Sequence, residues 1–282
     1  MLFADDTVLH VSNPSFENCV AMIETVLMTI TRWLDDNRLI ANIEKTKLMM
    51  ITNKSVEYLP DILFKGVRLD WVQSIKYLGL YIDNNLTFNF HIDYICSRLS
   101  KLRGVFYSLT KYVPTKCLIS LYYSLVYPIL SQDIILWGGI SNNKMGKIQV
   151  LQNHILRCIL KVKRFNGVPT VHVNDMYLQL EFLKTKNIYS LNLLKFVHFI
   201  LFKRFDVFIE NFAIHLPKSN YNIRNSIINL PKIRTETEKM STVFNCCNLI
   251  RTYDPDFLLP QSIPRLKNKY KIKALSSYLD DD

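Results

Sequence analysis

The chain has 282 residues, 49% of them hydrophobic, with only seven glycines and ten prolines. A chain of this length and composition can bury a sizeable core, which excludes an intrinsically disordered protein and suggests one to three domains. Its formal net charge is +11, so a polyanion is a candidate partner.

The N-terminal segment begins with an expected strand. Residues 2–11 are expected to form the second strand of a hairpin, with Asp5 and Asp6 at its turn. Ser15 follows an Asn-Pro break and can cap a helix. Apolar residues then recur at a spacing of three or four, which predicts an amphipathic helix ending near Asn37. These apolar residues are Val20, Ile23, Leu27, Ile30 and Leu34.

Strands are expected next. The apolar run 48–51 predicts a buried strand, and the alternating pattern from Ile62 to Asp83 around Gly66 predicts two or three antiparallel strands.

From about residue 88 the pattern becomes helical. Apolar residues from 92 to 109 recur every three or four positions, which predicts a helix with a narrow seam for packing against another helix. Pro114 begins a second helix that is expected to run to about Pro128. Further helices are expected over 143–161 (with Leu151, Ile155 and Ile159 inward), 175–184 and 187–205, and the remainder, 206–282, is expected to be loosely helical.

Positive charge is concentrated between residues 96 and 165, where eleven lysines and arginines accompany a single acidic residue, Asp133. A charged run is often only a solvated helix face, but an excess this one-sided also fits a surface that contacts phosphates. The candidate nucleic-acid-binding residues here are Arg98, Lys101, Arg103, Lys111, Lys116, Lys147, Arg157 and Lys161.

Two adjacent carboxylates, Asp5 and Asp6, are the candidate metal ligands. Mg²⁺ is a hard cation that prefers oxygen ligands, so a tight Asp-Asp turn suits it. Taken alone, Asp-Asp-Thr is also an ordinary turn. The sequence that follows it supplies a more specific signal.

An ordered series of motifs follows Phe3-Ala-Asp-Asp6. They are Trp33–Leu39, Asn42–Thr46, Tyr77–Asp83, Leu86–Ile92, Leu121–Pro128, Trp137-Gly138 and Leu151–Arg157, with fainter traces in Tyr221–Arg224 and Asp256–Pro260. This series resembles the palm-to-thumb passage of non-LTR (jockey-like) retrotransposon reverse transcriptases, and it covers essentially the whole chain.

The resemblance implies roles for individual residues. Asp5 and Asp6 would be the metal-binding pair, and Lys45 would lie near the phosphates of the incoming nucleotide, where a cation can stabilise departing pyrophosphate. Tyr77, Leu78 and Gly79 would form a primer-gripping hairpin. By residue type alone, Lys45 could equally be a solvated turn lysine, and Tyr77-Leu78-Gly79 a plain buried strand.

The resemblance also implies an α+β fold, with a small antiparallel palm remnant over 1–85, a basic helical thumb over 86–165 and a helical C-terminal region over 166–282. The implied activity is RNA-directed DNA polymerisation with two Mg²⁺ ions. The implied partners are an RNA template, a DNA primer or target DNA, and deoxynucleoside triphosphates. Because two-metal catalysis needs carboxylates on both sides of the ion pair, and only one such half is recognised here, we expect the chain by itself to be inactive.

Two other classes stay open. One is a non-catalytic, helical nucleic-acid-binding protein derived from a mobile element. The other is a helical scaffold or membrane-associated protein, although neither apolar stretch, 118–131 or 188–202, offers the roughly 20 uninterrupted apolar residues that span a bilayer. Both stretches are expected to be buried helices. Six scattered cysteines and the lack of a secretory leader favour an intracellular setting.

Overall fold

The computed structural model describes residues 2–3, 6–52, 56, 58–162, 164–165, 168–203, 232–252 and 261–280. The chain divides into two compact units, unit 1 (Met1–Leu86) and unit 2 (Thr87–Asp282). Small sheets occur in both units, but most of the described chain is helical, which confirms an α+β fold.

Unit 1 contains one long helix, α1 (Phe16–Asp36). The Ser15 hydroxyl accepts a hydrogen bond from the Asn18 backbone N–H at its start, and the Asn37 side chain donates one to the Trp33 carbonyl at its end. Leu27 on its inner face is buried against Ile62, Phe64 and Leu69. The predicted helix, its cap and its apolar face are therefore confirmed. Half-buried residues that complete this cluster include Val20, Ile23, Ile30 and Leu34.

The expectation of one strand over residues 2–11 is wrong. Strand β1 (Leu2–Phe3) pairs antiparallel with β2 (Asp6–Thr7), and Phe3 is the partner of Asp6, so the chain reverses direction between these two residues. Aspartate favours such reversals because its short side chain can hydrogen-bond to the nearby backbone.

The predicted buried strand over 48–51 is also wrong. Strand β3 covers only Lys47–Leu48, and Ile51 is exposed. Leu48 packs against the Leu27 cluster, but the partner strand β6 (Asp70–Trp71) is itself two residues long, so the ladder ends there. This pairing is parallel, whereas only antiparallel pairing was expected.

Two hairpins account for most of the antiparallel pairing that was predicted between Ile62 and Asp83. Strand β4 (Leu63–Phe64) pairs with β5 (Val67–Arg68), and β7 (Ser74–Tyr77) pairs with β8 (Leu80–Asp83). Both two-residue turns, Lys65-Gly66 and Leu78-Gly79, have positive φ at both positions. This is the I′ turn, whose twist matches that of paired strands.

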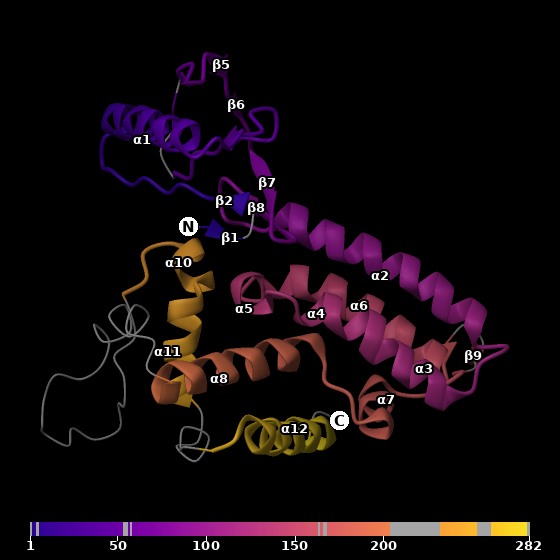
Figure 1. Cartoon of the computed structure of the whole chain (residues 1–282). Helices are drawn as coiled ribbons and strands as arrows, with labels where there is room; N and C mark the ends of the chain where they lie inside the picture. The colour runs from indigo at the N-terminus through magenta and orange to yellow at the C-terminus, as the bar shows by residue number, and fades with distance from the viewer. Residues whose placement is uncertain are drawn as a thin grey trace, which may run out of the picture. The chain divides into compact units, whose positions relative to one another are not determined.

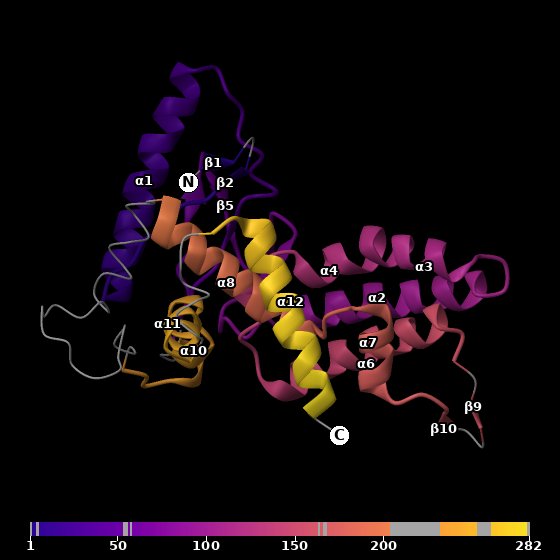
Figure 2. The same cartoon turned by 90° about the horizontal axis from the view of Figure 1, so that it is seen from below.

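Unit 2 is mainly helical (Figures 1 and 2). Its helices are α2 (Asn89–Leu109), α3 (Thr115–Leu121), the π-helix η1 (Tyr122–Val126), α4 (Tyr127–Ser131), α5 (Ile134–Trp137), α6 (Asn142–Ile159), α7 (Val173–Leu180), α8 (Thr185–Lys203), α10 (Glu236–Met240), α11 (Thr242–Thr252) and α12 (Ile263–Asp280), with a short pairing of β9 (Arg164–Phe165) and β10 (Val168–Pro169).

Helices α2 and α6 pack along each other, as Figures 1 and 2 both show. The predicted seam of α2 is confirmed, since Ile92, Ile95, Leu99 and Phe106 are buried. The expectation for α6 needs one correction. Leu151 is only half-buried, and its neighbour Gln152 is fully buried instead.

Gln152 points inward because it is the centre of a polar network. Its amide N–H₂ group donates to the Tyr122 hydroxyl and to the Leu183 carbonyl, each at 2.8 Å. Its amide oxygen accepts from the Thr185 N–H at 3.1 Å and from the Thr185 hydroxyl at 2.9 Å. Periodicity predicts an apolar residue at an inward position. Glutamine can occupy this one because four hydrogen bonds satisfy the polar groups of its side chain.

The helix that was expected from Pro114 to about Pro128 continues to Ser131 as α3, η1 and α4. In the widened turn the Tyr127 N–H bonds to the Tyr122 carbonyl, five residues back. Pro128 follows directly. Proline has no N–H and its ring crowds the preceding turn, so the widened turn lets the helix continue past Pro128.

The two apolar stretches weighed as membrane segments are buried helices, as predicted, with Leu118, Val126, Leu191 and Leu194 among their buried residues. Within the described residues, none of the helices has the length and hydropathy that a bilayer span requires.

Candidate nucleic-acid interface

The candidate metal turn is described only in part. Asp6 is the first residue of β2 and is exposed, so its carboxylate is accessible to a cation, whereas Asp5 lies outside the described residues. Among the residues that are described, no three His, Cys, Asp or Glu side chains gather as metal ligands would. The Asp5–Asp6 site therefore stays a prediction.

Lys45 lies in a turn, with its side chain exposed. Its backbone N–H donates to the Asn42 side-chain oxygen at 3.1 Å, and the Thr46 N–H closes the turn on the Ile43 carbonyl. Asn42 thus fixes the local backbone through its side chain. Lys45 and Asp6 belong to the same unit, and among the residues that the structure describes no hydrogen bond or ion pair joins their side chains.

The Tyr77-Leu78-Gly79 segment forms the end and turn of the β7–β8 hairpin. Tyr77 pairs with Leu80, so Leu78 and Gly79 are the two turn residues, with φ values of 47° and 91°. Leu78 is 42% exposed at the tip. The alternative reading of this segment as a plain buried strand is therefore wrong. A projecting hairpin is compatible with a primer contact, which stays a prediction.

Most candidate basic residues of unit 2 have exposed side chains, but they do not form one stripe. Arg98 and Lys101, three residues apart, share one side of α2, and the Arg98 guanidinium lies 5.7 Å from the ring centre of Tyr94. Arg103 is two residues further on and points to another side. The exposed residues are Arg98, Lys101, Arg103, Lys111, Lys116, Lys147 and Lys161.

Arg103 and Lys147 lie beside the α2–α6 seam. Burial raises the pKa of the Cys158 thiol, and the positive charge of Arg103 partly opposes this shift. Burial likewise raises the pKa of Cys96, aided by Asp93 and opposed by Lys147. Arg103 of α2 thus acts on a cysteine of α6, and Lys147 of α6 acts on a cysteine of α2. Each helix therefore contributes one cation along the seam.

Arg157 differs from the other candidates. It is half-buried, and its charge acts to lower the pKa of Tyr177, although burial dominates and leaves that pKa well above its ordinary value. Its Nε atom is buried and has no hydrogen-bond partner among the described residues. Arg157 therefore faces the interior of unit 2 more than the other candidates do.

Two tyrosines that sequence reasoning did not assign accompany the basic residues. Tyr107, near the end of α2, is 67% exposed, and Tyr112, in the turn before α3, is 83% exposed. The signal was present in the sequence, where Arg103, Tyr107 and Lys111 recur every four residues. Exposed aromatic rings between cations are the combination that binds single-stranded nucleic acid, by stacking and by charge.

Comparison with known proteins gives relatives of one kind. The chain is 27% identical over 175 residues to a probable RNA-directed DNA polymerase from transposon BS of Drosophila melanogaster, covering 60% of this chain and 19% of that protein. It is 24% identical over 171 residues to the RNA-directed DNA polymerase from mobile element jockey of the same fly, covering 59% and 18%. The chain is a relative of the jockey-like reverse transcriptases.

The predicted resemblance is thereby confirmed over about 60% of the chain, and its extension over essentially the whole chain stays a prediction. The jockey polymerase of Drosophila funebris is similar to the chain as well, at 24% identity over 161 residues. The jockey-like chain spans about a fifth of the length of these curated relatives. No protein-family model and no solved structure matches it.

Several motifs that carry the jockey-like resemblance contact one another in unit 2. The imidazole of His91 lies edge-on to the indole of Trp137, with ring centres 5.7 Å apart. Tyr122 and Gln152, from two further motifs, share a hydrogen bond. In this half of the chain, the motif residues therefore build the packed core of the helical unit.

Proposed function

We propose that the chain is part of an RNA-directed DNA polymerase of a non-LTR retrotransposon. In this proposal unit 1 is the palm portion and bears the metal turn, while residues 87–165 of unit 2 are the thumb and hold the template and primer. The observation that supports it most is the match to jockey-type polymerases over 175 residues. Unit 1 has only 86 residues, so the match includes part of unit 2.

The proposed chemistry assigns a role to each candidate residue of unit 1. Asp5 and Asp6 would hold Mg²⁺, which stabilises charge that develops during nucleotidyl transfer. Carboxylate oxygens suit this ion, and the exposed side chain of Asp6 fits that role. Lys45, also exposed, would lie against the triphosphate, and the Leu78-Gly79 tip would contact the primer. The substrates would be deoxynucleoside triphosphates on an RNA template.

Activity is expected to require more than these 282 residues. The separate chain should not extend a DNA primer on an RNA template with Mg²⁺, because one Asp-Asp turn supplies carboxylates on one side of the ion pair only. Joined in frame behind the part of a jockey polymerase that precedes the matched segment, it should become active. Changing Asp5→Ala in that fusion should lower activity more than about 100-fold, since even groups that merely orient metal ligands contribute 10- to 100-fold.

The matched control is Asp36→Ala in the same fusion. Asp36 is an exposed carboxylate at the end of α1, and its removal should leave primer extension unchanged. Extension by the separate chain that disappears in Asp5→Ala would contradict the proposal that it is inactive alone. Full activity of the fusion with Asp5→Ala would contradict the metal assignment.

A second candidate function, non-catalytic nucleic-acid binding, is favoured by the exposed cations of α2, α3 and α6. Duplex DNA is expected to bind independently of sequence, with affinity falling as salt rises. About four phosphate contacts would give a slope near −3.6 for log affinity against log salt, at roughly −0.9 per contact. Replacing Arg98, Lys101 and Arg103 by Ser should flatten this slope toward −1, as measured by fluorescence anisotropy.

An equal change of charge elsewhere serves as the control. Lys232, Arg234 and Lys239 are exposed and lie before α11, so replacing them by Ser should leave most of the slope intact. A wild-type affinity that does not depend on salt, or equal effects of the two triple variants, would refute the α2–α6 surface as the interface.

A further inference from the structure

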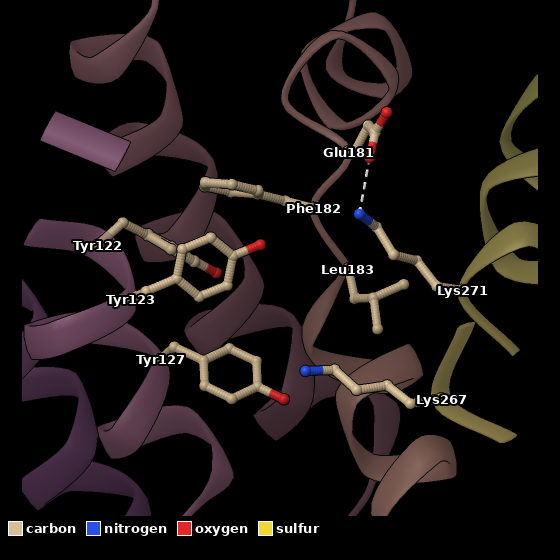
Figure 3. A pocket seen from close by; sticks show the side chains of 8 residues that line it. All are labelled: Tyr122, Tyr123, Tyr127, Glu181, Phe182, Leu183, Lys267 and Lys271. Atoms are coloured by element: carbon tan, nitrogen blue, oxygen red, sulfur yellow. Dashed lines mark hydrogen bonds and ion pairs between the residues drawn. The ribbon is translucent and has the colours of Figure 1, made fainter. Parts of the chain in front are cut away.

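A small aromatic pocket lies in unit 2. It opens between the Tyr122–Tyr127 segment, the residues after α7, and α12 (Figure 3). Phe182 forms one wall and stacks on Tyr122, with ring centres 4.3 Å apart and planes inclined by 23°. Tyr123 meets Phe182 edge-on at 5.1 Å, and Tyr127 lies 5.8 Å from Tyr123.

The π-helix brings the three tyrosines to one side. Because the Tyr127 N–H bonds to the Tyr122 carbonyl, Tyr127 follows Tyr122 by one widened helical turn. Tyr123 lies between the two in the chain. Figure 3 shows all three side chains directed toward the pocket. The Gln152 hydrogen bond to the buried Tyr122 hydroxyl fixes the floor. Tyr123 remains 46% exposed, so its ring is accessible to a ligand.

Two lysines of α12 reach the pocket from the opposite side. The Lys271 ammonium is 2.8 Å from the Glu181 carboxylate, which offsets its charge. The Lys267 ammonium is directed toward the Tyr127 ring in Figure 3, and it forms no ion pair with a residue that the structure describes. Burial, and then the nearby charge of Lys267, lower the pKa of Lys195. An anion here would relieve that repulsion between like charges.

The space is the size of one ring. The cavity volume is about 140 Å³, close to the roughly 150 Å³ of an apolar cavity that holds one benzene molecule. One six-membered ring fills this volume, whereas a fused purine would extend beyond it toward the open side of the pocket. Aromatic walls favour a flat ring by stacking, and a lysine at the rim that pairs with no described carboxylate favours a phosphate.

We propose that the pocket receives one unpaired pyrimidine nucleotide of a single strand, with its base between Tyr123, Tyr127 and Phe182 and its phosphate at Lys267. This inference rests on the proposed function, because that function makes nucleic acid the aromatic anion that the chain meets. It adds a site for a single base to the phosphate contacts that are proposed for the cations of α2, α3 and α6.

The test compares fluorescein-labelled strands of equal charge by anisotropy. The probes are oligothymidylate, oligodeoxyadenylate and an abasic strand, each of about ten nucleotides, within the span of known single-strand sites. Oligothymidylate should bind the full chain about 5- to 150-fold more tightly than the abasic strand, the contribution of one stacked base. Oligodeoxyadenylate should gain less affinity over the abasic strand than oligothymidylate does, because part of the purine would remain outside the pocket. Equal affinity for all three strands would overturn the proposal, and so would a preference for adenine.

Variants at exposed residues distinguish the contribution of the base to binding from that of the phosphate. Tyr123→Ala should bring the ratio of thymidylate to abasic affinity close to one. Lys267→Ser should weaken all strands and flatten the salt slope by about 0.7. Glu181→Gln should tighten binding, because it releases Lys271. Lys273, exposed on α12 and outside the pocket lining, gives the matched control. Lys273→Ser should keep the thymidylate preference, and loss of the preference in Lys273→Ser but not in Tyr123→Ala would refute the assignment.

Two results keep this inference apart from the proposed function. Salt-dependent duplex binding without a thymidylate preference would refute base binding at the pocket while supporting the α2–α6 interface. A thymidylate preference that Tyr123→Ala abolishes, without duplex binding, would support the pocket while that interface fails. Phenyl phosphate provides the last check. Competition by phenyl phosphate as strong as that by thymidine monophosphate would mean that the site takes any phosphorylated ring, and would overturn recognition of a base.

Discussion

Replacing Gln152 by alanine is expected to lower the free energy of unfolding of unit 2 by about 4 kcal/mol. The change removes the partner of the Tyr122 hydroxyl, the Leu183 carbonyl and the Thr185 hydroxyl, and each buried group left unsatisfied costs about 1–3 kcal/mol. The Thr185 N–H keeps a bond to Gln149, so the loss stays below the sum of four bonds. Urea denaturation followed by circular dichroism and by fluorescence measures it.

Tyr122→Phe is the matched control for Gln152→Ala. It removes one hydroxyl and keeps the ring, and Gln152 can still donate to Leu183, so the expected loss is about 1 kcal/mol. In the double variant the two losses should not add, because both act on the same hydrogen bond. A loss below about 1 kcal/mol for Gln152→Ala would show that the network contributes little to stability.

Gly138→Ala is expected to destabilise unit 2 by about 3 kcal/mol, near the upper end of the cost of overpacking. A Cβ atom at Gly138 would collide with the Cδ2 atom of Tyr189, and would lie 2.5 Å from the Ile134 carbonyl oxygen. The backbone oxygen cannot move aside without breaking the turn, and Tyr189 is buried. For a unit of this size the melting temperature should fall by roughly 6–12 °C.

Gly104 and Gly146 provide controls of the same chemistry. They lie within α2 and α6, and a Cβ atom on either would meet nothing within 4 Å. Gly104→Ala and Gly146→Ala are therefore expected to stabilise the unit by about 0.5–1 kcal/mol, the difference in helix propensity between the two residues. Equal melting temperatures for Gly138→Ala and Gly104→Ala would contradict the close approach of Tyr189.

The helices were the most predictable part of the fold. The spacing of apolar residues gave α1 and α2 within a residue or two, because a helix buries one face and its period is local. Ser15 at the start of α1 was predictable for the same reason, since a cap bonds within its own turn. The short strands were less predictable. The lengths of β3 and β6 depend on each other, because a ladder ends where either strand ends. Strands β1 and β2 depend on a chain reversal inside a segment that was expected to form one strand.

The candidate site, like the fold, was predictable from the sequence only in part. The sequence by itself determined the charge excess of residues 96–165, the order of the motifs and the family they resemble, because all three are properties of the chain as written. Only the tertiary structure decided that Gln152 is buried, that Arg157 turns inward, and that Tyr123, Phe182 and Lys267 surround one cavity. These three residues come from separate segments, and contacts between distant segments depend on how η1, the connection between α7 and α8, and α12 pack, which no local period records.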